Sequence, residues 1–194
     1  MKKLLLVVAL ATLPTLSHAA VFTDNFDGDA LALNQTTFLG GWTLFSGSVD
    51  LIGAGSPDLY NLLPGNGRYV DLDGSTNNAG VFDKQLALAG GTTYTLSFDL
   101  AGSQRGDVNS VDVIFGTSSQ TFILNSADPF TTHTMSFTTG GNALYQIDFH
   151  NAGGDNYGAL LDNVTVTAVP EPETYLLMLG GLGLVGFVAR RKQV

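Results

Sequence analysis

Between residues 20 and 169, the sequence is a succession of short runs in which apolar and polar residues alternate. Residues 94–100 form the clearest run, because Tyr, Leu, Phe and Leu occupy every second position and Thr, Ser and Asp lie between them. A period of two is typical of a β-strand with one buried face. Residues 134–137 and 144–149 alternate in the same way, and further β-rich runs occupy residues 69–72, 81–88, 111–115, 121–124 and 160–166.

Turn-forming residues separate these runs, for example Asp73-Gly74, Gly90-Gly91 and the glycine-rich stretch 153–155. Such pairs favour tight turns because Gly adopts positive φ without steric cost. We find no convincing amphipathic helix between residues 20 and 169. The pattern predicts an all-β fold, a jelly-roll β-sandwich, as one domain over residues 20–168. Because the chain contains no Cys, this domain depends on its core rather than on disulfides.

The N-terminus has the three parts of a secretory signal peptide. Lys2 and Lys3 form a basic start, residues 4–13 are apolar, and Ser17-His18-Ala19 places small residues before a cleavage point. This order predicts a signal peptide over residues 1–19, export by the Sec machinery and cleavage after Ala19. The alternative is an internal apolar strand.

The C-terminal residues 169–194 form a separate segment. Val169-Pro170-Glu171-Pro172 precedes an apolar run over residues 175–189, and Arg190, Arg191 and Lys192 follow it. The prolines prevent a continuous helix from the domain and keep Glu171 accessible to a protease. With Thr174 the run would span roughly 24 Å as a helix, which is short for a hydrocarbon core of about 30 Å. We predict a short transmembrane helix whose basic end stays cytoplasmic. The alternative is an ordinary anchor with a proline-rich stalk.

In this order and position, the three C-terminal features resemble the PEP-CTERM sorting signal. The resemblance implies a protein exported by a Gram-negative bacterium. It implies a transient stay in the inner membrane and processing by an exosortase-type protease. The cell envelope, the cell surface or the extracellular space would then be the final location.

Charge excludes one class of function. The whole chain has a net charge of −9, every acidic residue between positions 20 and 169 is Asp, and the only bases there are Arg68, Lys84 and Arg105. Nucleic-acid binding requires clustered Lys and Arg that displace counterions, so we expect no nucleic-acid partner. Asp also decorates turns and keeps a surface soluble, which is the plainer reading of this composition.

Five motifs occur in an order that resembles the galactose-binding-like β-sandwich superfamily, which includes many carbohydrate-binding modules. They are Asn25-Phe26-Asp27-Gly28, Trp42, residues 67–74, residues 94–100 and residues 158–164. The resemblance covers nearly all of the exported domain. It implies a structural Ca²⁺ where the first strand meets the last, with Asp27 and Asp162 at the matching positions. This chain has Asp27 where many relatives have Glu, and Asn163 where a second acid is common.

The residues themselves support a cation site only in part. Asp24 and Asp27 lie in one short loop, and strand pairing would have to bring Asp162 to them. Ca²⁺ takes six to eight oxygen ligands, so backbone carbonyls would complete the set. We predict one structural Ca²⁺ at Asp24, Asp27 and Asp162. The alternative is a solvated acidic loop.

A sugar site combines an aromatic platform with short polar side chains, because a pyranose has an apolar face and a rim of hydroxyls. Tyr60 and Tyr157 lie in loop-like segments rich in Gly, Pro and Asn, whereas Trp42 between Leu39 and Leu44 is expected in the core. The predicted ligand-binding residues are Tyr60, Asn151, Asp155, Asn156 and Tyr157. A glycine-rich loop without a ligand is the alternative.

Evidence for catalysis is thin. The sequence has no Cys nucleophile and no G-x-S-x-G or H-E-x-x-H motif. His133 and His150 are predicted at the surface, and Asp71 and Asp73 are interpreted as part of a turn. We therefore predict that the protein is not an enzyme.

The favoured hypothesis is an exported binding module for exopolysaccharide or another glycan. The alternative is a structural protein of the matrix or envelope without a specific ligand, and a glycan hydrolase is the least favoured.

Overall fold

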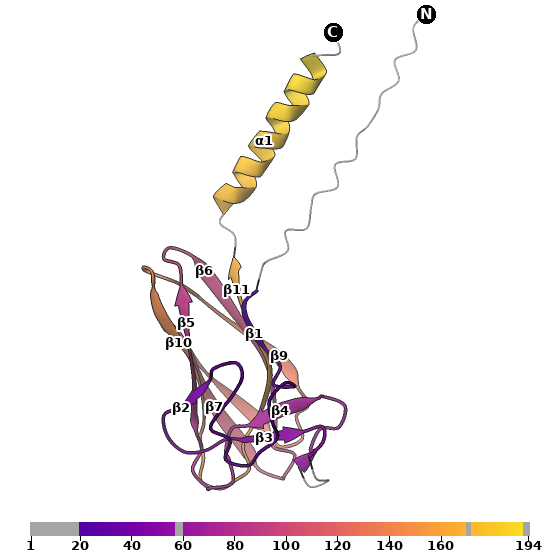
Figure 1. Cartoon of the computed structure of the whole chain (residues 1–194), viewed down its shortest axis with the longest axis vertical. Coiled ribbons are helices and arrows are strands. Elements are labelled where there is room, and N and C mark those ends of the chain that lie inside the picture. Colours follow the sequence, from indigo (N-terminus) through magenta and orange to yellow (C-terminus); the bar gives the residue numbers. More distant parts are fainter. Residues whose placement is uncertain (1–19, 57–59, 170–171, 192–194) are drawn as a thin grey trace, which may run out of the picture.

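A computed structural model describes residues 20–56, 60–169 and 172–191. Two antiparallel sheets stack face to face as a β-sandwich (Figure 1). The predicted all-β class is confirmed. The strands are β1 (Ala20–Asp24), β2 (Thr43–Leu44), β3 (Asp50–Gly53), β4 (Arg68–Asp71), β5 (Val81–Leu88), β6 (Thr93–Ala101), β7 (Val108–Phe115), β8 (Ser118–Asn125), β9 (Thr131–Thr138), β10 (Ala143–Asn151) and β11 (Leu160–Val169).

One sheet has six strands in the order β3-β4-β11-β6-β9, with β1 also paired to β11. The other has five strands in the order β2-β5-β10-β7-β8. Each alternating or β-rich run of the sequence overlaps one of the strands from β4 to β11. Where a strand has one buried face, as in β6, the period of two is the cause. The pattern does not reveal β1, β2 or β3, since β2 has two residues and all four residues of β3 are buried.

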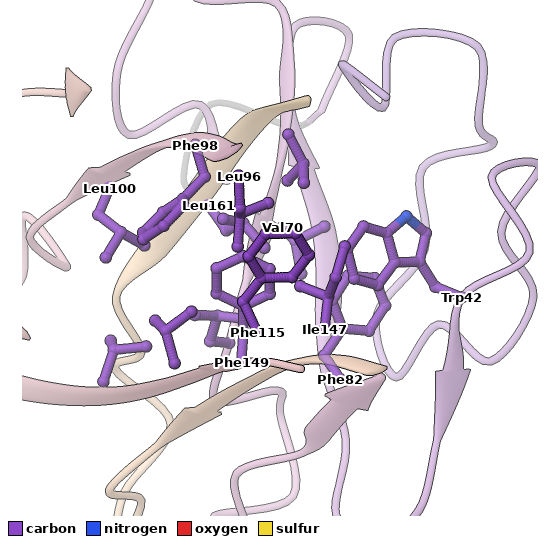
Figure 2. Close-up of a cluster of buried hydrophobic side chains, with 14 of the residues drawn as sticks. Trp42, Val70, Phe82, Leu96, Phe98, Leu100, Phe115, Ile147, Phe149 and Leu161 are labelled. Atoms are coloured by element: carbon purple, nitrogen blue, oxygen red, sulfur yellow. The ribbon is translucent and has the colours of Figure 1, made fainter. Parts of the chain in front are cut away.

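Aromatic and branched side chains from both sheets fill the space between them (Figure 2). Trp42 lies in this core, as predicted, and its ring stacks on Phe82 with centroids 4.5 Å apart and planes 9° apart. The Trp42 indole N–H donates to Oδ2 of Asp24 over 2.9 Å, so the polar atom of the ring has a partner. Burial of such a ring contributes about 2–3 kcal/mol to the stability of the fold. The Trp42–Phe82 stack therefore helps to hold the inner face of the five-stranded sheet in place.

Strand β11 organises the six-stranded sheet, because it pairs with β6 along one edge and with β1 and β4 along the other. Its register with β6 shifts between Asp162 and Thr165, where Asn163 has a φ of 50°. Asn tolerates this left-handed conformation better than a bulky residue does. The irregularity places Asp162 close to the start of the chain.

The C-terminal segment contains a helix, α1 (Pro172–Arg191), with Arg190 and Arg191 in its last turn. Within residues 20–56, 60–169 and 172–191, no helix is long and apolar enough to cross a membrane. The transmembrane span predicted over residues 175–189 is therefore not found there.

Candidate functional site

The outer face of the five-stranded sheet carries an unusual set of polar side chains. Phe82 of β5 and Phe149 of β10 point into the core, so their neighbours Asp83, Asp148 and His150 lie on the outer face. The same alternation on β2, β7 and β8 adds further residues. We call this surface the acidic face: Thr43, Asp83, Asp112, Thr121, Gln146, Asp148 and His150.

Asp83 and Asp148 face each other on this surface, because they are paired in the β5–β10 register. They are only 2% and 8% exposed. The Thr43 hydroxyl donates to Oδ1 of Asp83 over 3.2 Å, and the Gln146 amide donates to Oδ2 of Asp148 over 2.9 Å. Oδ2 of Asp83 and Oδ1 of Asp148 have no donor. One proton between the two carboxyl groups would satisfy both atoms.

Burial raises the pKa of Asp148 to about 7, and the adjacent Asp83 carboxyl adds to that rise. Two carboxylates this close cannot both ionise without repulsion, so one holds a proton to higher pH than usual. Near neutral pH the pair therefore offers both hydroxyl-donor and carboxylate-acceptor character.

A cavity of about 370 Å³ hollows the neighbouring part of the sheet and is lined by Asp112, Ile114, Ser119, Gln120 and Thr121. The Thr121 hydroxyl donates to Oδ1 of Asp112 over 2.6 Å. His150 is paired with Asp112, and Asp148 with Ile114, in the β10–β7 register. The strand register therefore places His150 and Asp148 beside two residues that line the cavity.

Phe45 supplies an apolar surface at the margin of the acidic face. It follows β2, its N–H donates to the Val81 carbonyl over 3.2 Å, and it is 69% exposed. Val81 is in turn paired with His150 across β5 and β10. An exposed aromatic ring beside hydroxyl, amide and carboxyl groups is the mixture that binds sugars.

A second group of functional side chains lies at one end of the sandwich, where β4, the β6–β7 loop and the β10–β11 loop meet. We call it the loop end: Asp71, Asp73, Arg105, Asp155 and Tyr157. The Arg105 guanidinium bonds to Oδ2 of Asp71 over 2.5 Å and lies 4.9 Å from the Tyr157 ring centroid. Burial raises the pKa of Asp71, and Arg105 opposes that rise. Tyr157 itself is 40% exposed.

Part of the predicted ligand set lies here. Oδ1 of Asp155 accepts the Tyr157 N–H over 2.9 Å, in a tight turn that leaves Asn156 exposed. Asn151 is buried, and its Oδ1 accepts the Ala159 N–H over 3.4 Å, so it supports the loop. The turn expected at Asp73 is present, since the Asp73 N–H donates to Oδ1 of Asp71 over 3.1 Å.

Tyr60 lies elsewhere. It lines an apolar cavity of about 230 Å³ together with Leu31, Leu33, Leu51 and Ile52. Tyr60 packs against the small apolar cluster that contains Ile52 and Leu160, whereas Tyr157 lies on Arg105, so the two predicted platforms have different surroundings.

The structure brings Asp162 close to the acidic loop at the start of the chain. Burial raises the pKa of Asp162 to about 7, and the charges of Asp27, Asp99 and Asp24 add to this rise. Protein donors already occupy the other two predicted ligands. Asp24 accepts the Phe26 N–H and the Trp42 indole N–H, and Asp27 accepts the Arg68 N–H and the Asn25 amide.

In the parts of the chain that the structure describes, no three acidic, His or Cys side chains are grouped so as to hold a metal. The Ca²⁺ expected at Asp24, Asp27 and Asp162 therefore stays a prediction.

His133 corrects another prediction, because it does not lie on the solvent side of its strand. It shares the inward parity of Met135 and Phe137 on β9, and its ring lies 4.7 Å from Phe122 and 5.8 Å from Phe98. Burial lowers its pKa. His150, by contrast, is exposed as predicted.

Sequence reasoning missed Asp83, Asp112, Asp148, Phe45 and Arg105. A signal was available for two of them, since Asp112 and Asp148 interrupt strongly apolar runs at outward positions. It did not reveal that their strands are neighbours in the sheet.

The sorting residues are only partly described. Val169 ends β11 and is exposed, Pro172 begins α1, and Arg190 and Arg191 are exposed. Ala19, the rest of the predicted signal peptide, Pro170 and Glu171 lie outside the described residues.

The fold is that of a carbohydrate-binding-module β-sandwich. The CBM22-1 xylan-binding domain of Paenibacillus barcinonensis Xyn10C is similar over 80% of this chain and 97% of that domain, with 13% identity and a TM-score of 0.51. A Clostridium thermocellum xylanase with CBM22-1 and GH10 modules, complexed with xylohexaose, is similar over 80% of this chain and 29% of that one, with 12% identity and a TM-score of 0.50. An arabinose-bound GH51 α-L-arabinofuranosidase is similar over 78% of this chain and 26% of that one, with 13% identity and a TM-score of 0.52.

Residues 23–167 match the model of DUF642, described as a protein of unknown function, and the chain belongs to that family. Residues 168–192 match the PEP-CTERM protein-sorting motif. The protein is thus an exported protein with a C-terminal sorting signal. No curated protein matches the sequence.

Proposed function

We propose that the protein is a non-catalytic glycan-binding protein that holds exopolysaccharide, or another glycan without acidic groups, on the acidic face. The observation that carries the proposal is the polar cavity of about 370 Å³ on the outer face of the five-stranded sheet. Its lining residues Asp112 and Ile114 pair with His150 and Asp148, and Phe45 is exposed at the margin of the same face.

The chemistry of the face favours a ligand rich in hydroxyls. Asp112, Thr121, Gln146 and His150 provide donors and acceptors at neighbouring positions on β7, β8 and β10, and a sugar ring can lie on Phe45. Lys84 is the one Lys or Arg residue of strands β5, β7, β8 and β10, and it does not belong to the acidic face. Its ammonium group lies over the Phe22 ring and donates to the Gly41 carbonyl. Carboxylates without paired bases repel an acidic polysaccharide.

The similar folds support this proposal at the level of architecture. One of them is a xylan-binding domain, and the same arrangement of two sheets provides this chain with an open outer face. A shared fold does not specify a ligand, so the assignment rests on the side chains of the acidic face.

We further propose that an exosortase-type protease processes the chain in the segment from Val169 to Pro172, after which the domain resides in the envelope or matrix. The sorting motif supports this assignment. The rigid Pro170 and Pro172 would present Glu171 in an extended conformation.

Affinity electrophoresis of the full chain through gels that contain xylan, a β-glucan or an acidic polysaccharide tests glycan binding. We expect retardation by a neutral glycan, and a loss of affinity of about tenfold or more, equivalent to roughly 1.4 kcal/mol, in Phe45→Ala and Asp112→Ala. Thr134→Ala on the outer face of the other sheet is the matched control and should behave as the wild type.

Tyr60→Ala and Tyr157→Ala examine the sites predicted at the loops. If only Tyr157→Ala weakens retention, the glycan site moves to the loop end. If no glycan retards the wild type, the proposal fails and a structural matrix protein without a specific ligand becomes the better explanation. Release of reducing ends from the polysaccharide would contradict the non-catalytic assignment.

A further inference from the structure

Three buried Asp residues lie near the loop end, and they differ in how their charges are satisfied. Asp50 accepts three hydrogen bonds, from the Asn34 N–H, the Ser75 N–H and the Ser75 hydroxyl. Asp71 is paired with Arg105 and accepts the Asp73 N–H. Asp73 is 0% exposed, and its carboxylate oxygens have no well-formed hydrogen bond, although the Asp155 backbone N–H lies near them.

A buried carboxylate without a partner is strongly unfavourable. Asp73 therefore requires a positive charge or a proton that its protein surroundings do not supply. Arg105 does not supply it, because its guanidinium is directed at Asp71 and Tyr157, and its own Nε is buried without an acceptor. A proton would remove the charge but would satisfy only one of the two oxygens. A cation satisfies both carboxylate oxygens at once.

The surroundings of Asp73 are acidic and closely packed. Burial raises the pKa of Asp73 to about 6, and the Asp155 carboxylate is the charge that raises it most. A side chain at Gly158 would clash with the Asp73 backbone and with the Asp71 carboxylate. The Leu72 N–H donates to the Ala159 carbonyl over 3.0 Å, which fixes the end of β4 against the β10–β11 loop. Asp73 and the Asp155 loop are therefore held together.

We propose that the loop end binds one hard divalent cation, Ca²⁺, through the carboxylates of Asp73 and Asp155, with backbone carbonyls of the β10–β11 loop completing its oxygen shell. Ca²⁺ accepts irregular sets of carboxylate and carbonyl oxygens, so this site does not need a third acidic ligand. It is distinct from the site predicted at Asp24, Asp27 and Asp162, and it does not depend on glycan binding.

The cation would also fix the position of Tyr157. Asp155 accepts the Tyr157 N–H, and the Tyr157 ring lies on Arg105. A cation bound by both Asp155 and Asp73 would therefore hold the β10–β11 loop, and Tyr157 with it, in the conformation described here.

Isothermal titration of the EDTA-treated full chain with Ca²⁺ tests the proposal, together with thermal unfolding at each Ca²⁺ concentration. We expect one equivalent to bind and the melting temperature to rise with Ca²⁺ by mass action. Asp73→Asn should lower Ca²⁺ affinity at least about tenfold, as expected for a direct ligand. Asp155→Asn changes an exposed residue and should weaken binding in the same direction, even if Asp73→Asn compromises folding.

Terbium luminescence distinguishes this site from the one predicted at the start of the chain. Tyr157 adjoins Asp155, whereas Trp42, the only Trp in the chain, bonds to Asp24. We expect Tb³⁺ emission through tyrosine but not through selective excitation of tryptophan. Three results would each overturn the proposal: no Ca²⁺ binding, wild-type affinity in both variants, or loss of binding only in Asp27→Asn and Asp162→Asn with tryptophan-sensitised emission.

Discussion

The outer faces of the two sheets are both polar, but they satisfy their polar groups in different ways. On the six-stranded sheet, hydroxyls pair across strands: Thr93 with Thr138 over 2.8 Å and Thr95 with Ser136 over 2.9 Å. We call this surface the hydroxyl face. On the acidic face, Asp83 and Asp148 each retain an oxygen without a donor. A face whose polar groups pair with one another is suited to hydration. The acidic face instead needs a proton between two carboxyl groups and has a polar cavity beside them, which suits a ligand rich in hydroxyls.

The same contrast occurs within the loop end. The carboxylates of Asp50 and Asp71 accept hydrogen bonds from protein donors, as the polar groups of the hydroxyl face do. The carboxylate oxygens of Asp73 lack such donors, as one oxygen each of Asp83 and Asp148 does. Buried polar groups in folded proteins are almost always paired. The exceptions in this molecule are therefore the places where a proton, a cation or a ligand is expected.

Removing the core beneath each face should give the largest effect. Phe82 is fully buried against Trp42 beneath the acidic face, whereas Met135 lies on the edge strand β9 beneath the hydroxyl face. We expect Phe82→Ala to lower the free energy of unfolding by about 3–5 kcal/mol and Met135→Ala by about 2 kcal/mol. Urea denaturation measures both. Equal losses would show that the two layers are equally well packed and that Trp42–Phe82 stacking adds nothing.

The carboxyl pair should give the next largest effect, and it depends on pH. The pKa of Asp148 is raised from 3.8 to about 7 in the folded chain, so the folded state favours the protonated form. This stabilisation is fully present below pH 3.8 and is lost as the pH rises toward 7. Asp148→Asn places an amide donor against Asp83, and we expect a gain of about 1–3 kcal/mol at pH 8 with no gain at pH 4.

Asp99→Asn is the matched control for the carboxyl pair. Asp99 lies on the hydroxyl face and accepts hydrogen bonds from the Thr132 hydroxyl and the Asn163 amide. The substitution should destabilise the protein at pH 8, because a carboxylate that is already satisfied loses acceptor strength. Thermal unfolding between pH 4 and pH 8 separates the two variants, and a stabilised Asp99→Asn would remove the distinction between the faces.

The hydroxyl pairs should give the smallest effect. In a double-mutant cycle of Thr95→Ala and Ser136→Ala, we expect a coupling energy of about 0.2–1 kcal/mol, as for other cross-strand pairs. Each hydroxyl is exposed or partly exposed, so water replaces the lost partner. A coupling energy well above that range would mean that the hydroxyl face is more rigid than a hydrated surface.

Sequence patterns predicted most of the framework. Alternation identified the strands from β4 to β11, and Trp42 was correctly predicted in the core. The candidate site was predicted less well. Tyr157 and Asp155 lie together at the loop end, but Tyr60 is separate and Asn151 is a buried support. His133 was placed on the wrong side of its strand because three neighbouring Thr residues masked its inward parity.

The sequence by itself determined the local properties of this protein: the strand periodicity, the turns, the acidic charge and the sorting motif at the C-terminus. These follow from contacts between residues that are near in the chain. Only the tertiary structure decided which outward-facing residues meet. Strand β10 lies between β5 and β7, and this non-sequential order places Asp148 against Asp83 and His150 against Asp112. Register over such distances is set by the packing of the whole core, so no local pattern records it.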